Sequence, residues 1–127
     1  MAAFCFYTYG TDMALTTFLQ RLHDSPDSVC FKETMALIDE LYDFTPTAFI
    51  NGATRNEAGQ NNGSCKLFSF AKLHGLSQQQ TLTCFGDYYR KDVLGNPDGT
   101  DHANIRNFMK SGWEGISFEG SALKPKM

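Results

Sequence analysis

Cys65 is the residue best suited to covalent chemistry, and it follows a polar, glycine-containing stretch that spans residues 56–64. We predict a helix capped by Ser64, which puts the thiol in the first turn. There, unpaired backbone N–H groups and the helix dipole favour the nucleophilic thiolate. His102, beside Asp101 at another predicted helix start, would be the base of a thiol enzyme. The alternative places Cys65 in the core and His102 on the surface, and spacing leaves both open.

A second group of polar and aromatic side chains suits the binding of a small ligand. They gather in the amide-rich loop before Cys65, in the sequence DYYR, and around a helix start that we predict near residue 101. The candidate ligand-binding residues are Asn56, Glu57, Asn61, Tyr88, Arg90, Asp101 and Arg106. The alternative is structural, because such side chains also satisfy helix ends, shape irregular loops and form charge pairs along a helix.

The sequence predicts neither a phosphate-binding loop nor a metal centre. A phosphate-binding loop has four residues between its glycines and a lysine directly after the second. Only three residues separate Gly59 from Gly63, and Lys66 follows after Ser-Cys. The cysteines stand at positions 5, 30, 65 and 84 without a C-x-x-C pair, which fits no zinc module. We therefore expect no metal and no cofactor.

The elements that must position these residues are mainly helical. Apolar residues recur at helical spacing in five stretches, each preceded by a residue that is able to cap a helix. We predict helices at residues 13–24, 28–42, 64–74, 78–92 and from about 100 to 112. Ser77 with Gln80 forms a capping box, and Asp27 or Ser28 caps the second helix. The third helix is apolar on most sides, which is typical of the middle of a bundle.

Two short stretches favour strands. Residues 44–49 are rich in aromatic and β-branched side chains, and residues 115–118 alternate in polarity. We predict that the two segments pair as a short two-stranded β element. The predicted fold class is therefore mainly α: a single compact domain of about five helices with this β element.

Composition indicates one globular domain in a chain of 127 residues, of which 42% are hydrophobic. We predict that the helical domain spans residues 13–123, with residues 1–12 as an N-terminal extension and residues 124–127 as a tail. The net charge is −3 and basic residues are dispersed, so no nucleic-acid partner is expected. The N-terminal run MAAFCFYTYG is too short to span a membrane, and no membrane partner is expected. Without a recognisable secretion signal, the cysteines are expected as reduced thiols in a cytosol.

Four runs of sequence carry a resemblance to a known family: TMALIDELYDFTPTAFING, NEAGQNNGSCKLFSFAKLHGLS, QTLTCFGDYYRKDVL and GTDHANIRNFMKSGWEGISF. In this order they cover about residues 28–118, and they resemble the HopJ type III effector family. The resemblance implies a bacterial cytoplasmic protein, with type III secretion implied by the family label alone. It carries over no activity, cofactor or catalytic residue.

Three functions are open at this point, and the oligomeric state is open as well. The protein would be an effector or adaptor that binds a partner protein, a domain that binds a small ligand, or a cytosolic thiol enzyme that uses Cys65 with His102. The deciding observation is whether the loop around residues 56–65 and the helix start at residues 100–106 converge on one pocket.

Overall fold

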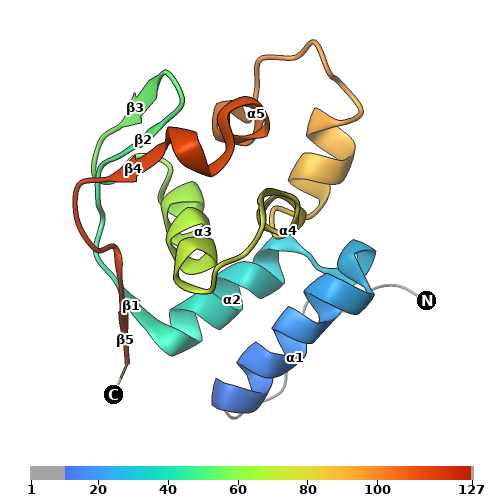
Figure 1. The fold of residues 1–127 in the computed structure, drawn as a ribbon, viewed down its shortest axis with the longest axis vertical. Helices are drawn as coiled ribbons and strands as arrows, with labels where there is room; N and C mark the ends of the chain where they lie inside the picture. Colours follow the sequence, from blue (N-terminus) through green and yellow to red (C-terminus); the bar gives the residue numbers. More distant parts are fainter. Residues whose placement is uncertain (1–10, 127) are drawn as a thin grey trace.

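Helices account for most of the fold in the computed structural model, which describes residues 11–126. The α-helices are α1 (Thr11–Asp24), α2 (Phe31–Leu41), α3 (Asn62–Leu73), α4 (Gln78–Thr83) and α5 (Ala103–Ser111). A π-helical turn (Tyr88–Val93) and two 3-10 turns (Pro26–Ser28 and Gly112–Gly115) add to them. The prediction of a mainly helical single domain is confirmed (Figure 1).

α3 lies in the middle of the fold, packed against α2 and α4 (Figure 1). Its side chains Leu67, Phe68 and Phe70 are fully buried. The ring of Phe68 packs against those of Phe108 and Phe85, with ring centroids 4.9 and 5.5 Å away. Full burial of one such aromatic side chain contributes about 1.5–3 kcal/mol. The centre of α3 therefore anchors the core, as its apolar sequence predicts.

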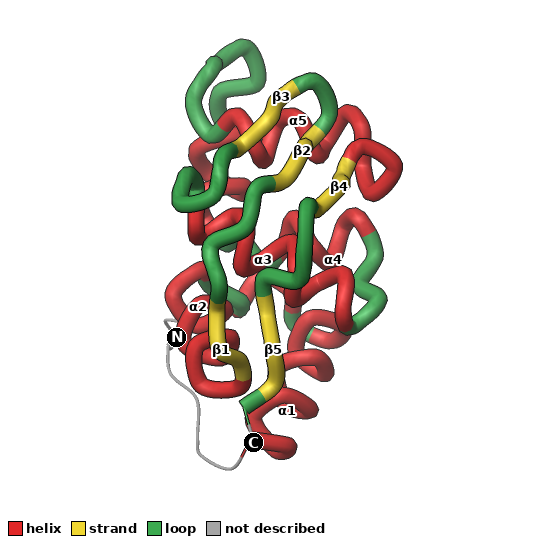
Figure 2. The backbone as a smooth tube through the Cα atoms, turned by 90° about the vertical axis from the view of Figure 1, so that its left-hand side faces the viewer, coloured by secondary structure: helices red, strands yellow, loops and turns green. Residues whose placement is uncertain are grey.

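The strands form two small antiparallel sheets (Figure 2). One consists of β1 (Tyr42–Phe44) and β5 (Leu123–Pro125), and in the other β2 (Phe49–Asn51) lies between β3 (Thr54–Asn56) and β4 (Ile116–Phe118). The predicted pairing of residues 44–49 with residues 115–118 is confirmed in β2 and β4, where Phe49 lies opposite Phe118.

Phe44 belongs to the other sheet, because the chain around Pro46 leaves the strand conformation. Proline has no N–H to donate to a neighbouring strand, and residues 45–48 link the two sheets without forming a strand. β1 pairs instead with β5, so Lys124 and Pro125 lie in a strand rather than in the predicted tail.

Two predicted helix starts differ from those in the structure. α2 begins at Phe31 rather than at residue 28, because Ser28 belongs to a 3-10 turn in which its hydroxyl donates to Ser25 O at 2.7 Å. α3 begins at Asn62, so Ser64 lies inside the first turn and is not the cap.

The predicted fourth helix over residues 78–92 consists of two shorter pieces. α4 begins with the predicted capping box, formed by Ser77 and Gln80, but it stops before Gly86. Gly86 has a φ of +65°, and an added Cβ there would lie 2.8 Å from Phe31 N. Glycine lets the two backbones approach each other in this conformation. Close packing against α2 therefore interrupts the helix that periodicity predicts.

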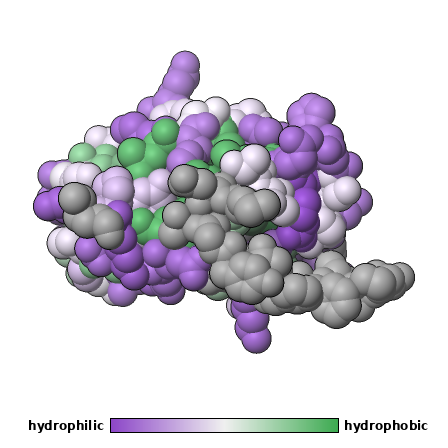
Figure 3. Space-filling view, turned by 90° about the horizontal axis from the view of Figure 1, so that it is seen from below, coloured by the Kyte–Doolittle hydropathy of each residue, from purple (hydrophilic) through white to green (hydrophobic). Residues whose placement is uncertain are grey.

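The predicted N-terminal extension falls outside the described residues, except that residues 11 and 12 belong to α1. Across residues 11–126, no helix is long and apolar enough to cross a membrane. Figure 3 shows one face of the molecule, on which hydrophobic residues form separate patches between hydrophilic ones.

Candidate functional site

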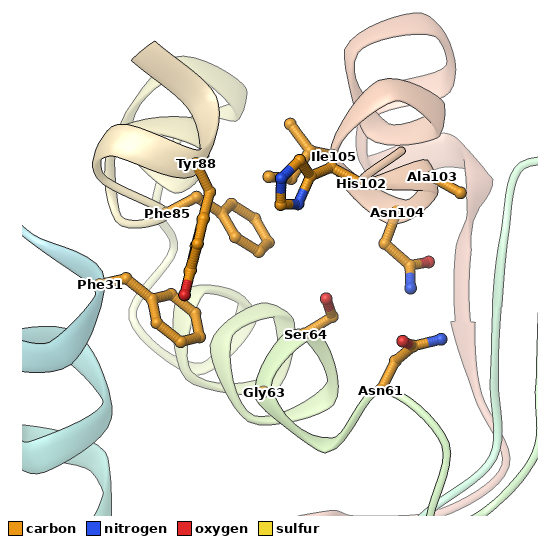
Figure 4. Close-up of a pocket in the computed structure, with 10 residues that line it drawn as sticks. All are labelled: Phe31, Asn61, Gly63, Ser64, Phe85, Tyr88, His102, Ala103, Asn104 and Ile105. Carbon is orange, nitrogen blue, oxygen red and sulfur yellow. The ribbon is translucent and has the colours of Figure 1, made fainter. Parts of the chain in front are cut away.

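A pocket of about 450 Å³ opens where the first turns of α3 and α5 face a group of aromatic rings (Figure 4). It is lined by Phe31, Asn61, Gly63, Ser64, Phe85, Tyr88, His102, Ala103, Asn104 and Ile105. The loop around residues 56–65 and the helix start at residues 100–106 therefore converge on one pocket.

The polar side of the pocket consists of two helix starts with the same backbone geometry. Asn61 precedes α3 with φ 53° and ψ 49°, and His102 precedes α5 with φ 52° and ψ 49°. This left-handed conformation is unfavourable for residues other than glycine, although Asn and His adopt it more readily than most. No described side chain caps either helix. Their first-turn N–H groups therefore lack a side-chain acceptor and lie at the positive end of each dipole.

Aromatic rings form the opposite side of the pocket. Phe31, from the start of α2, packs edge-on against Tyr88 at 5.2 Å between ring centroids and stacks on Phe85 at 6.2 Å. The Tyr88 ring also lies 5.2 Å from the His102 ring. Because 45% of Tyr88 is exposed, its ring is accessible from solvent.

The His102 side chain is oriented by carboxylates as well as by Tyr88. Its Nε2 lies 3.1 Å from Asp92 Oδ2 and 3.9 Å from Asp101 Oδ2. Asp101 also accepts a hydrogen bond from Arg106 Nη2 at 2.7 Å, and this bond lowers the pKa of the Asp101 carboxyl. Both carboxylates beside the pocket therefore already have a partner within the protein.

Besides Asp101, three further predicted ligand-binding residues have roles in the chain itself and do not line the pocket. Arg106 donates hydrogen bonds to backbone carbonyls of the loop before α5. Arg90 Nη2 donates to Val29 O at 2.7 Å. Glu57 is exposed and pairs with Arg55 at 2.8 Å. Their part in ligand binding stays a prediction.

Asn56 lies in a buried cluster of asparagines behind the pocket. Asn51, Asn56 and Asn104 are 0, 2 and 7% exposed. Asn104 Nδ2 donates to Asn56 Oδ1 at 3.0 Å, and Asn51 Nδ2 donates to Asn104 Oδ1 at 2.9 Å. Asn61, which lines the pocket, donates to Asn56 Oδ1 at 2.7 Å. The cluster therefore joins β2 and β3 to both helix starts.

Cys65 lies in the core and does not line the pocket that His102 borders. It is 1% exposed, and its Sγ donates a hydrogen bond to Thr47 O at 3.4 Å. Burial raises the pKa of the Cys65 thiol. The pocket thus does not bring Cys65 and His102 together, and the thiol-enzyme hypothesis stays a prediction.

Cys84 and Cys30 differ in their state. Cys84 is a free, fully buried thiol, and burial raises its pKa. Cys30 is disulfide-bonded, so the expectation that the cysteines are reduced is wrong for this residue. Within the described part of the chain, no three His, Cys, Asp or Glu side chains are grouped to hold a metal ion.

Sequence reasoning names Asn61, Tyr88 and His102 among the lining residues and misses the others. Periodicity does not reveal that Phe31 and Phe85 border a pocket, because core residues follow the same spacing. Asn104 does carry a signal, since an asparagine in a helical first turn has low helix propensity and a strong tendency to bond nearby groups.

The chain matches a family model and a solved structure. The model, described as HopJ type III effector protein, matches residues 15–123. The chain is also similar to the crystal structure of VPA0580, a protein of unknown function, with 52% identity and a TM-score of 0.88. That similarity covers 95% of this chain and 97% of VPA0580. No curated protein matches the chain.

Proposed function

The chain belongs to the HopJ type III effector family, as its sequence predicts, and from this premise we propose that it binds a small ligand between α3 and α5. The proposed ligand combines an anionic group with a flat apolar part. The observation that carries the proposal is that two uncapped helix starts and a group of rings border one pocket.

The first turns of the two helices supply the preference for an anion. Gly63 and Ser64 from α3 and Ala103 and Asn104 from α5 all line the pocket. A helix N-terminus carries roughly half a positive charge and presents backbone N–H donors. Two such ends beside one pocket favour carboxylate, sulfate or phosphate oxygens over a neutral group.

The aromatic side supplies the preference for a flat apolar group. Phe31 and Tyr88 present apolar ring surface to the pocket, and the His102 ring lies next to Tyr88. Phe85 and Ile105, which are almost fully buried, complete this wall. Offset or edge contacts between aromatic rings contribute about 0.5–1.5 kcal/mol beyond the burial of area. A ligand with both parts uses both sides of the pocket, which a bare anion or a hydrocarbon does not.

We test the proposal with phenyl phosphate as the probe, measured by titration calorimetry against inorganic phosphate and phenol. Phenyl phosphate should bind most tightly, because it alone combines both groups. Ser64→Asp places a carboxylate in the first turn of α3, where it should stabilise the helix by about 0.3–1 kcal/mol. The same charge should repel the probe and abolish its binding, so loss of binding would not reflect unfolding.

Gln79→Asp is the matched control for the added charge. Gln79 is exposed in the first turn of α4 and does not line the pocket. This variant should bind phenyl phosphate like the wild-type protein. Wild-type affinity in Ser64→Asp, or phenol that binds as tightly as phenyl phosphate, would contradict the proposal.

We further propose that the protein meets this ligand in the bacterial cytoplasm or, after type III secretion, in a host cell. The support for secretion is the family description alone. A fusion to a reporter that becomes active only inside host cells separates the two locations. A signal that requires an active secretion apparatus supports delivery, and its absence restricts the protein to the bacterium.

A further inference from the structure

We infer that Asn56 is a positioning residue, whose side-chain oxygen holds the starts of α3 and α5 at a set separation across the pocket. The inference rests on the proposed function, because this separation matters only if both helix starts share one ligand. Asn56 itself lies behind the pocket and does not line it.

One oxygen atom joins the two helix starts. Asn56 Oδ1 accepts a hydrogen bond from Asn61 Nδ2 at 2.7 Å and another from Asn104 Nδ2 at 3.0 Å. Asn61 precedes α3 and Asn104 lies in the first turn of α5, and both line the pocket. Figure 4 shows these two side chains on the same side of the pocket. The separation of the two helix starts therefore depends on a third residue.

Asn56 is itself held firmly enough to serve as a reference point. It is 2% exposed, and in the β2–β3 pair it lies opposite Phe49, which is fully buried. Asn56 Oδ1 accepts two hydrogen bonds, and Asn56 Nδ2 donates to Asn104 Oδ1 at 3.3 Å. This buried amide therefore cannot rotate without leaving polar groups unpaired, which costs about 1–3 kcal/mol per group. The small sheet thus forms a fixed base for both helices.

The two helix starts depend on Asn56 to different degrees. Asn104 has a second support, because Asn51 Nδ2 donates to Asn104 O at 2.8 Å and to its Oδ1 at 2.9 Å. Within the described residues, the Asn61 side chain makes a single hydrogen bond, which is the one to Asn56. Loss of Asn56 should therefore displace the start of α3 more than the start of α5.

The experiment compares Asn56→Ala with Asn107→Ala in the full chain. Asn107 also ties α5 to the strands, since its Nδ2 donates to Asn51 O at 3.3 Å and to Thr54 Oγ1 at 2.9 Å, but it does not line the pocket. We expect Asn56→Ala to weaken phenyl phosphate binding about tenfold, whereas Asn107→Ala stays within about twofold of wild type, because small misplacements of binding groups reduce their effect steeply.

Backbone amide NMR signals of the ligand-free protein give a readout that lost stability alone would not change. The Ser64 signal should move in Asn56→Ala and stay in place in Asn107→Ala. A folded Asn56→Ala protein with an unmoved Ser64 signal, or with affinity within about twofold of wild type, overturns the inference.

A second variant covers the case in which Asn56→Ala does not fold. Asn56→Asp keeps an acceptor oxygen for Asn61 and Asn104, but it replaces the Nδ2 donor to Asn104 Oδ1 with a carboxylate oxygen, so its charge alone shifts nearby backbone signals. The readout in this variant is therefore the side-chain amide of Asn61, which should stay protected from hydrogen exchange in the ligand-free protein. Free exchange of this amide overturns the inference. If the wild-type protein fails to bind phenyl phosphate, the proposed function fails, and the ligand-free signals still decide whether Asn56 positions α3.

Discussion

The start of α4 and the starts of α3 and α5 show two ways for a helix to begin. In α4, Ser77 Oγ accepts a hydrogen bond from Gln80 N at 3.1 Å, and Gln80 Oε1 accepts one from Ser77 N at 3.0 Å. α3 and α5 begin after the left-handed residues Asn61 and His102, with no cap from any described side chain. The first start satisfies its own donors, whereas the other two leave donors to water or to a ligand.

The position of the pocket follows this difference. Residues from the uncapped starts of α3 and α5 line it, and neither Ser77 nor Gln80 does. A capping box, which is a strong sequence signal for a helix start, consists of polar side chains that already bond the backbone. A candidate site is therefore expected where a helix begins without such a signal.

The largest expected effect comes from Gly86, which follows the capped helix and lies against α2. Gly86→Ala places a Cβ 2.8 Å from Phe31 N in a residue whose φ is +65°. We expect the free energy of unfolding to fall by about 3 kcal/mol, from backbone strain and steric overlap together. Urea denaturation measures the change.

Gly75→Ala is the matched control for Gly86→Ala. Gly75 has a similar φ of +63°, but no described atom beyond its adjacent residues lies within 4 Å of an added Cβ. The left-handed conformation alone should lower stability by about 1–2 kcal/mol. Equal losses in the two variants would show that close approach to α2 is not what interrupts the helix.

The next effect concerns Cys65, which lies on the core side of α3 behind its uncapped start. Because burial raises the pKa of this thiol, the unfolded chain loses its proton first as the pH rises. Stability should therefore fall above the unfolded thiol pKa of about 8.5, by up to about 1.4 kcal/mol per pH unit for one thiol. Denaturation between about pH 8 and 10 should show a shallower fall in Cys65→Ala.

Alkylation tests the same residue directly, in a protein whose other cysteines are replaced by alanine. Cys65 should react only after denaturant is added, since it is buried in the native protein. Rapid reaction of native protein at neutral pH, slowed by His102→Ala, would instead support the thiol-enzyme hypothesis.

Ser77→Ala should produce a smaller loss, because it removes the cap of α4. We expect the free energy of unfolding to fall by about 1 kcal/mol, with phenyl phosphate affinity unchanged. Ser64→Ala is the control, since Ser64 lies inside the first turn of α3 and does not cap it. If Ser64→Ala is as destabilising as Ser77→Ala, the contrast between capped and uncapped starts is wrong.

The smallest expected effect is that of His102→Asn. Asparagine tolerates the left-handed conformation, so the free energy of unfolding should change by no more than about 0.5 kcal/mol. His102→Val should lower it by about 1–2 kcal/mol, because a β-branched residue is strained at this φ. Similar thermal unfolding of the two variants would show that the backbone at residue 102 leaves the left-handed region at little cost.

The sequence by itself determined the features that depend on residues close together in the chain. The capping box of Ser77 and Gln80 is visible as a spacing of three, and the structure contains it. The apolar character of α3 indicates its central position, and the strand-forming residues around Phe49 and Phe118 indicate their pairing. Each of these inferences uses preferences that act within a single segment.

Only the tertiary structure decided which faces of these elements meet. Ser64 lines the pocket while the next residue, Cys65, lies in the core, because successive residues of a helix point about 100° apart. Asn56 and Asn104 are far apart in the sequence and are hydrogen-bonded in the interior. The physical reason is that periodicity specifies the secondary structure of a single segment. The packing of apolar side chains from distant segments decides which polar groups come into contact.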